Sequence, residues 1–204
     1  MHKEVLTQKQ QGLLPLLKSF GSDFGLAGGS AMALHIGHRQ SEDFDLISTK
    51  PFLNRIIRDK IVEQGFEIGR VLIDENNEYT ILINGVKLSF VRYPFPVKCE
   101  EDFGGLLHTF DLLTLSAMKA YMLGRRAKWK DYVDMFVILT DFFNLGRVVK
   151  RAKEIFGGEF DEKIFRASLC YFDDIDYTEE VRYMPGWHIS PKYIKKALSK
   201  IAVS

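Results

Sequence analysis

The stretch FGLAGGSAMALHIGHRQSEDFDLI, residues 24–47, decides the fold that we expect of this chain. A short apolar run leads into two glycines, and a compact helical pattern over residues 30–36 then ends at Gly37. The alternating polar and apolar residues 43–47 are typical of a strand. The stretch therefore predicts a strand, a glycine turn, a helix and a second strand.

Outside this stretch, the two halves of the sequence have different patterns. Residues 4–20 predict a helix that Pro15 kinks or breaks. The remaining elements predicted before residue 97 are a helix over 51–64 and strands over 66–73, 78–83 and 86–93, with a hairpin turn at Asn84-Gly85. Helices are predicted over 110–123, 130–143, 147–156, 162–171 and from Pro191 to the end. The expected fold class is α+β: a mixed sheet with helices in residues 1–97, followed by a helical domain in residues 98–204.

Composition limits the class of protein. The chain has 204 residues, of which 46% are hydrophobic, and this is enough apolar material for a core. Its net charge of +1 excludes a basic nucleic-acid footprint over the whole chain, so any site for a polyanion must be local. No apolar run of about 18 residues predicts a membrane span. The start of the chain lacks the apolar core of a signal peptide, and Cys99 and Cys170 show no metal-binding spacing, so we expect a cytoplasmic protein.

The glycine turn has the composition of a phosphate-binding loop. Gly28 and Gly29 allow the backbone to turn sharply and to approach a ligand closely. Ser30 lies at the start of the predicted helix, where free N–H groups and the positive end of the dipole favour an anion. Its hydroxyl can donate to a phosphate oxygen, although the residue can equally be an ordinary serine N-cap.

Two carboxylates follow closely. On a strand, Asp43 and Asp45 point to the same side and Phe44 points into the core. Two like charges in one space are unfavourable unless a cation lies between them, and Mg²⁺ prefers such oxygen ligands together with substrate phosphates. A solvated edge strand is the alternative for the pair alone. Because the glycine turn precedes the pair, the combination favours a site for metal and nucleotide.

These motifs resemble a known superfamily. Gly-Ser followed by Asp-x-Asp is similar to the active-site signature of the DNA polymerase β-like nucleotidyltransferases. The finer pattern, with His38-Arg39-x-Ser41 before the carboxylates, looks like the AbiEii family, the nucleotidyltransferase toxins of abortive-infection toxin–antitoxin systems. The resemblance covers residues 24–140 and includes a downstream signature at Lys119, Arg125 or Arg126, Lys130-Asp131 and Asp134.

The resemblance implies an activity and its partners. It implies transfer of a nucleoside monophosphate from an NTP, with Mg²⁺ or Mn²⁺, to an acceptor that is an RNA such as tRNA or a protein. A cognate antitoxin is the partner expected of such a toxin.

The resemblance also implies roles for single residues. Asp43 and Asp45 would ligate the metal, and Gly28, Gly29 and Ser30 would hold the phosphates. Lys119 and Arg126, seven residues apart and expected on one helix face, would contact the triphosphate. Asp131 would orient Lys119 or act near the acceptor, and Arg39 would brace the carboxylates or bind phosphate. Alternatively, Arg39 is a surface arginine in a loop, and Lys119 and Arg126 form a solvated basic face or pair with Asp131 and Asp134.

One position departs from the superfamily pattern. Many members carry a third carboxylate on a later strand, and the matching position in the predicted strand 86–93 is Ser89. This difference keeps one alternative open, a catalytically weak or inactive module that binds an NTP or a partner protein. A further alternative is a small-molecule nucleotidyltransferase of the antibiotic-modifying kind, which shares the first motif. The signature from Lys119 to Asp134 argues against it.

Overall fold

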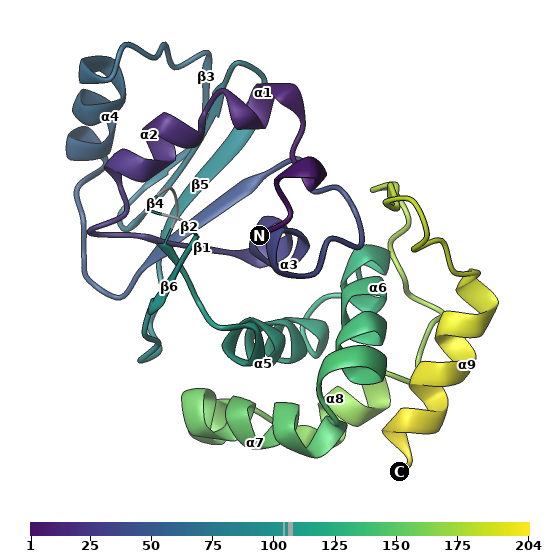
Figure 1. Ribbon diagram of the computed structural model, residues 1–204. Helices are drawn as coiled ribbons and strands as arrows, with labels where there is room; N and C mark the ends of the chain where they lie inside the picture. Colours follow the sequence, from purple (N-terminus) through teal and green to yellow (C-terminus); the bar gives the residue numbers. More distant parts are fainter. Residues whose placement is uncertain (104, 106–107) are drawn as a thin grey trace. The chain divides into compact units, whose positions relative to one another are not determined.

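The computed structural model describes residues 1–103, 105 and 108–204, which form two compact units, Met1–Asp111 and Leu112–Ser204. The first unit contains a sheet with its helices, and the second is helical (Figure 1). Both features agree with the predicted α+β class.

The sheet of the first unit has seven strands in the order β3-β4-β5-β2-β1-β7-β6. The strands are β1 (Gly25–Ala27), β2 (Phe44–Ser48), β3 (Arg70–Glu75), β4 (Glu78–Ile83), β5 (Val86–Arg92), β6 (Glu101–Asp102) and β7 (His108–Thr109). It is a mixed sheet, because β2 pairs with β5 and β1 with β7 in parallel while the other neighbours are antiparallel. The hairpin between β4 and β5 is confirmed, since Asn84 and Gly85 both have positive φ (53° and 79°) as a tight two-residue turn requires.

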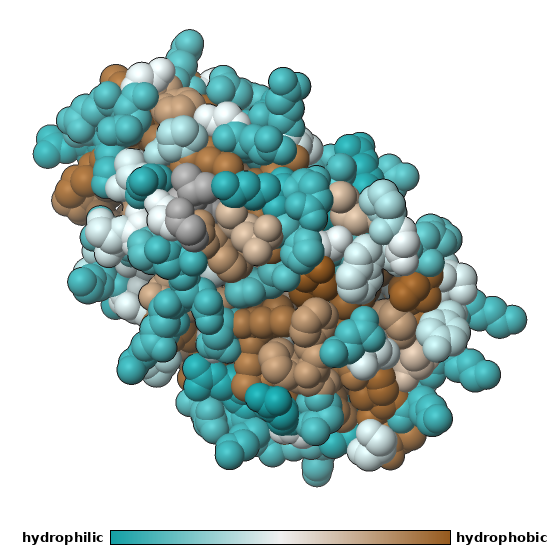
Figure 2. All heavy atoms as spheres, in the orientation of Figure 1, coloured by the Kyte–Doolittle hydropathy of each residue, from teal (hydrophilic) through white to brown (hydrophobic). Residues whose placement is uncertain are grey.

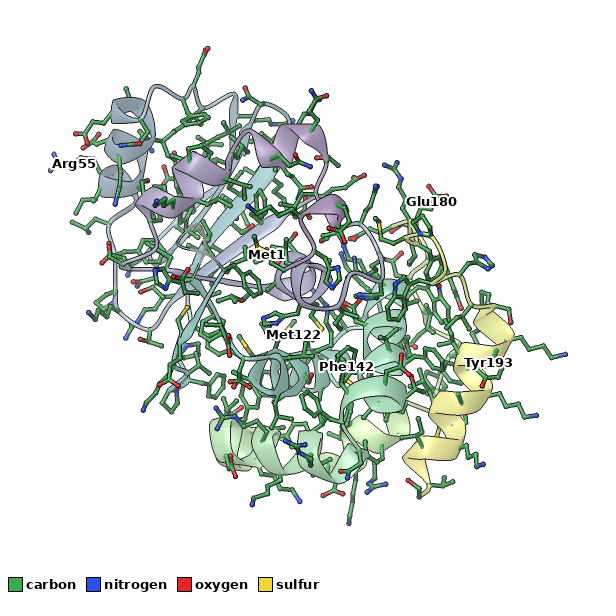
Figure 3. The ribbon with its side chains drawn as sticks, viewed as in Figure 1. Met1, Arg55, Met122, Phe142, Glu180 and Tyr193 are labelled. Carbon is green, nitrogen blue, oxygen red and sulfur yellow. The ribbon has the colours of Figure 1, made fainter. Side chains whose placement is uncertain are left out.

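One face of the sheet carries the apolar core of this unit. Phe44, Tyr79 and Phe90 are fully buried, as the alternation in the strands predicts. The ring of Phe20, at the end of α2, lies 4.9 Å from that of Phe90, and Lys60 of α4 (Asn54–Glu63) lies over Phe20. Helices α2 and α4 therefore pack on this face. Side chains such as Arg55 project from α4 away from the sheet (Figure 3).

The N-terminal segment is broken into short helices rather than kinked. They are η1 (Lys3–Val5), α1 (Gln8–Gln11), which Thr7 caps, and α2 (Leu14–Ser19), with Pro15 in its first turn. Two predicted helix starts were wrong. Helix α3 (Gly28–Ile36) begins at Gly28 rather than at Ser30, and α4 begins at Asn54 rather than near Pro51. Gly37 ends α3 with φ 79°, as predicted.

The sequence did not indicate β6 and β7. Leu26 of β1 is in register with Thr109 of β7, and the Thr109 hydroxyl donates to the Leu26 carbonyl at 2.8 Å. Because this pairing returns the chain to the sheet after residue 97, the first compact unit extends to Asp111, beyond the predicted boundary.

The second unit consists of helices α5 (Leu112–Leu123), α6 (Trp129–Val137), α7 (Leu145–Phe156), α8 (Glu162–Ser168) and α9 (Pro191–Ala202). The helix predicted over 130–143 is α6 followed by one π-helical turn, Ile138–Phe142. Asn144, Asp161 and Ser190 cap α7, α8 and α9.

On the face that Figure 2 shows, hydrophilic side chains lie around an area of apolar ones. Within the residues that the structure describes, no helix has both the length and the apolar character that crossing a membrane would require.

Candidate functional site

The glycine turn and Asp45 are in direct contact. Gly28 has φ 67°, which disfavours other residues, and Asp45 is in register with Ala27, the residue before it. A Cβ atom on Gly28 would collide with the Asp45 carboxylate. Glycine is therefore required at position 28 both for the turn and for the approach of this carboxylate to the start of α3.

Arg39 lies against the second glycine. A Cβ atom on Gly29 would come within 2.9 Å of Arg39 Nη2, and only 2% of Arg39 is exposed. Arg39 Nη1 also donates to the Gln40 carbonyl at 2.9 Å. A surface arginine in a loop is thus the wrong interpretation of Arg39. At the start of α3, the Asp45 carboxylate therefore lies beside Gly28 and the Arg39 guanidinium lies beside Gly29.

Ser30 is buried, and its hydroxyl already has a partner within the chain. It donates to the backbone carbonyl of Asp43. This bond joins the first turn of α3 to the residue just before β2, since the strand begins at Phe44 and not at Asp43. Ser30 therefore fixes the backbone on which Asp43 is carried.

Lys87 is a charged residue of this region that the sequence did not single out. Its Nζ lies 2.6 Å from Asp43 Oδ2, and the two side chains are 39% and 34% exposed. On β5, Lys87 precedes Ser89 by two positions, so both point to one face of the sheet. The alternation of polar and apolar residues in strand 86–93 is enough to predict that Lys87 and Ser89 share a face of the sheet. The pairing of Lys87 with Asp43 depends in addition on the register between β5 and β2.

Ser89 occupies the position next to Asp45. The two residues are in register across β2 and β5, and Thr80 of β4 continues the row beyond Ser89. A hydroxyl thus stands beside Asp45 where the superfamily pattern has a carboxylate. Among the described residues, no group of three or more His, Cys, Asp or Glu side chains is arranged to hold a metal ion. Mg²⁺ is nevertheless commonly bound by one or two carboxylates together with substrate phosphates. The carboxylates of Asp43 and Asp45 fit this ligand set.

The second unit contains a buried charged cluster. Lys119 of α5 places Nζ 2.7 Å from Asp131 Oδ1 and 2.9 Å from Asp134 Oδ2, both on α6. Both carboxylates are fully buried and Lys119 is 6% exposed. Asp131 and Asp134 are three residues apart and so share one helix face. Lys119 is therefore paired with both carboxylates, which is one of the alternatives that the sequence left open.

Arg126 joins this cluster from the other side of Asp131. Its Nε lies 2.9 Å from Asp131 Oδ2. The prediction that Lys119 and Arg126 share a helix face was wrong, because α5 ends at Leu123 and Arg126 lies in the turn before α6. Burial raises the pKa of Asp131, but the charges of Lys119 and Arg126 outweigh it and hold the pKa below its ordinary value. Asp131 is therefore ionised at neutral pH.

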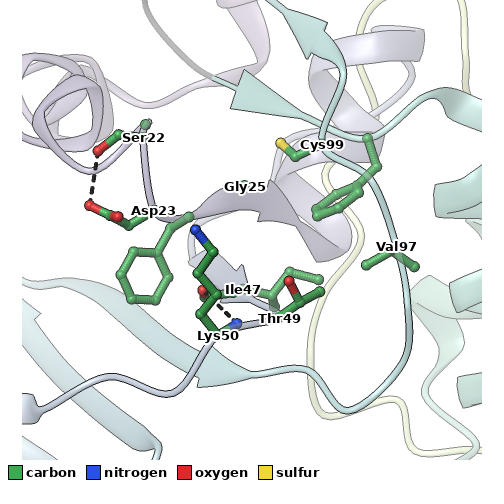
Figure 4. Close-up of a pocket in the computed structure, with 12 residues that line it drawn as sticks. Ser22, Asp23, Gly25, Ile47, Thr49, Lys50, Val97 and Cys99 are labelled. Carbon is green, nitrogen blue, oxygen red and sulfur yellow. Dashed lines mark hydrogen bonds between the residues drawn. The ribbon is translucent and has the colours of Figure 1, made fainter.

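A cavity of about 180 Å³ lies at the opposite end of β1 and β2 from Asp45 (Figure 4). Its lining includes Lys50, Ser22 and Cys99. Burial raises the pKa of the Cys99 thiol to about 11, so the thiol is protonated and unreactive at neutral pH. The cavity holds none of the residues that the motifs single out.

Comparison with solved structures identifies proteins with a similar fold. The chain is similar to MenT4, a nucleotidyltransferase toxin from Mycobacterium tuberculosis, with a TM-score of 0.62 and 12% identity over 95% of this chain and 81% of that one. It is similar to JHP933 from Helicobacter pylori, with a TM-score of 0.58 and 16% identity over 99% and 89%. The antibiotic-resistance factor ANT(2'')-Ia gives a TM-score of 0.51 and 15% identity over 72% and 92%. At these identities the likeness shows the nucleotidyltransferase fold.

Sequence comparison identifies the family. The chain is 28% identical to aq_aa25, an uncharacterized protein of Aquifex aeolicus, over 96% of this chain and 97% of that protein. The family described as "Nucleotidyl transferase AbiEii toxin, Type IV TA system" matches residues 16–187, which include the glycine turn, both strand carboxylates and the Lys119 cluster. The chain belongs to the AbiEii nucleotidyltransferase family.

Proposed function

We propose that this protein transfers a nucleoside monophosphate from an NTP to an RNA, such as tRNA, or to a protein acceptor, and that it is the toxin of a toxin–antitoxin pair. The observation that carries the proposal is the contact between Asp45 and Gly28. It places a carboxylate at the start of a nine-residue helix, where backbone N–H groups favour a phosphate. Membership in the AbiEii family supports an enzyme with this chemistry.

Asp43 and Asp45 are the proposed ligands of Mg²⁺ or Mn²⁺. When bound, a divalent ion of this kind neutralises charge on the phosphates and aligns the attacking and leaving oxygens. Asp45 is held by its contact with Gly28, and the backbone of Asp43 is held by Ser30. The chain thus positions the Asp45 carboxylate and the backbone of Asp43 before a nucleotide binds, which contributes to the preorganisation that phosphoryl transfer needs.

The other proposed roles concern the nucleotide. Gly28 and Gly29 let the triphosphate approach the backbone at the start of α3, and Arg39 beside Gly29 offers a cation for it. Ser30 contributes a phosphate contact only if its hydroxyl exchanges the Asp43 carbonyl for a phosphate oxygen. Lys119, with Arg126, is proposed to bind the triphosphate, and Asp131 to orient Lys119 through their 2.7 Å ion pair.

The experiment is a transfer assay. The purified protein is incubated with each labelled NTP, with Mg²⁺ or Mn²⁺, and with total RNA and cell extract as acceptors. We expect label to enter RNA or protein with the wild type, and transfer to fall about 100-fold or more in Asp43→Asn and Asp45→Asn, because each variant removes a metal ligand. Asp59→Asn is the matched control, since this exposed carboxylate lies on α4, 4.0 Å from Arg55 Nε.

Two results would count against the proposal. Equal transfer by the wild type and by both strand variants would show that the carboxylates have no catalytic role. Metal-dependent NTP binding without transfer to any acceptor would favour the second candidate, an NTP-binding module that has lost catalysis. The position of Ser89 beside Asp45 is the observation that favours this candidate, because a hydroxyl replaces a possible metal ligand there.

A further inference from the structure

Lys87 gives the carboxylate pair a built-in cation. Its ammonium lies 2.6 Å from one oxygen of Asp43, at a residue that we propose as a metal ligand. An ammonium at this distance interacts with the carboxylate oxygen that a divalent ion would use, and it repels an ion that approaches the same oxygen. The inference that follows rests on the proposed function of Asp43 and Asp45.

The surroundings of Lys87 allow its side chain to move while its backbone stays fixed. Strand β5 lies between β4 and β2, and the neighbours Val86 and Leu88 are buried, so the strand is held on both sides. The side chains of Lys87 and Asp43 are themselves 39% and 34% exposed. Ion pairs of this exposure are weak and readily exchanged, and lysine carries its charge on a flexible four-carbon stem.

We propose that Lys87 competes with the divalent ion for Asp43 and is released by the NTP. Without nucleotide, the ammonium remains on Asp43 and the carboxylate pair binds metal weakly. With nucleotide, a phosphate oxygen offers the ammonium a more strongly charged partner, and Asp43 becomes available to the metal that accompanies the NTP. Lys87 is thus a positioning residue that makes metal binding at Asp43 and Asp45 dependent on nucleotide.

The test is a titration with Mn²⁺ in the absence of nucleotide, in which the paramagnetic resonance signal reports the free ion. Lys87→Met removes the charge and keeps most of the stem, and we expect it to bind Mn²⁺ about tenfold more tightly than the wild type, because one repelling charge is gone. Lys87→Arg keeps the charge and should retain the wild-type affinity. Lys98→Met, which removes an exposed lysine paired with Glu100 at 3.7 Å, is the matched control and should change nothing.

A second arm tests the release by nucleotide. Addition of the four non-hydrolysable α,β-methylene NTPs should tighten Mn²⁺ binding by the wild type more than by Lys87→Met, so that the two affinities converge. The double variant Asp45→Asn/Lys87→Met should lose the tight binding, which locates the ion at the carboxylate pair.

Several outcomes would overturn the inference. They are a Lys87→Met protein that binds Mn²⁺ no more tightly than the wild type or not measurably, tight binding that persists in the double variant, and an equal effect of nucleotide on both proteins. Circular dichroism of each variant shows whether it is folded. Failure here is distinct from failure of the proposed function, because the transfer assay with wild type and Asp45→Asn measures activity and the titration measures competition for Asp43.

Discussion

The Asp43–Lys87 pair of the first unit and the Lys119 cluster of the second combine the same kinds of charge in different surroundings. Asp43 lies just before β2 and Lys87 lies on the neighbouring β5, and their side chains are 34% and 39% exposed. Asp131 and Asp134 lie on one helix face, are fully buried, and are matched by Lys119 and Arg126. In the second cluster, two buried carboxylates therefore pair with two cations.

The difference teaches which ion pair can exchange its partner at low cost. An exposed ion pair contributes little to stability and exchanges its partner at low cost. A buried carboxylate that loses its cation remains in an apolar interior, and this is strongly unfavourable. We therefore expect changes at the strand pair to affect function more than stability, and changes at the buried cluster to affect stability first.

The largest expected effect is at the buried cluster. Asp131→Asn should lower the free energy of unfolding by about 3–5 kcal/mol, because Arg126 and Lys119 both lose the buried carboxylate with which they pair. Urea unfolding followed by circular dichroism measures the change. The control is Asp161→Asn, which alters an exposed cap of α8. A loss below about 1 kcal/mol at Asp131 would mean that the cluster is not structural, and the contrast between the two regions would fail.

The same cluster predicts a pH dependence. Because the folded-state pKa of Asp131 lies below its ordinary value of 3.8, the folded protein binds fewer protons than the unfolded chain in that range. The stability that Asp131 adds is therefore fully present above its unfolded pKa and is lost as the pH falls through the lower folded value. From about pH 5 to 7, Asp131 is ionised in both the folded and the unfolded chain. The difference in unfolding free energy between the wild type and Asp131→Asn should therefore be constant over this range. A difference that already shrinks near about pH 6 would contradict the lowered pKa.

A medium effect, on Mn²⁺ affinity, is expected when a carboxylate is added beside Asp45. Ser89→Asp would add an acid in register with Asp45, and we expect Mn²⁺ affinity to rise about tenfold because another oxygen ligand and another negative charge are added. Isothermal titration with Mn²⁺ measures it, with Ser89→Ala as the neutral control. Unchanged affinity in Ser89→Asp would indicate that the metal does not bind beside Asp45.

Substitution of Ser30 should have a smaller effect on stability and on nucleotide transfer. Ser30→Ala removes the hydrogen bond to the Asp43 carbonyl, and we expect about 1 kcal/mol less stability in urea unfolding. Transfer should fall less than in Asp43→Asn, because the carboxylate remains while its backbone is held less firmly. A loss of transfer as large as that of Asp43→Asn would instead favour direct phosphate binding by the Ser30 hydroxyl.

The smallest expected effect is the stability change in Asp43→Asn. It removes an exposed ion pair with Lys87 and should lower the unfolding free energy by less than about 1 kcal/mol, while transfer falls about 100-fold or more. Urea unfolding and the transfer assay, carried out on one preparation, measure the effect on stability and the effect on transfer separately. A stability loss near that of Asp131→Asn would remove the distinction between the two clusters.

The sequence by itself determined the features that depend on neighbouring residues. The turn at Gly28, the end of α3 at Gly37 and the hairpin at Asn84-Gly85 follow from backbone conformations that few residues other than glycine and asparagine adopt. The burial of Phe44 between two carboxylates follows from the two-residue period of a strand. The resemblance to the AbiEii family also rested on local motifs, the glycine turn with Asp43 and Asp45 and the signature from Lys119 to Asp134.

Only the tertiary structure decided which partners these residues meet. Lys87 reaches Asp43, and Ser89 lies beside Asp45, because β5 pairs with β2 in one particular register. The hydroxyl of Ser30 is used by a carbonyl thirteen residues away, and Arg126 contacts Asp131 from a turn rather than from a helix face. Strand register and the packing of helices depend on contacts between distant parts of the chain, and the spacing of residues in one segment does not contain them.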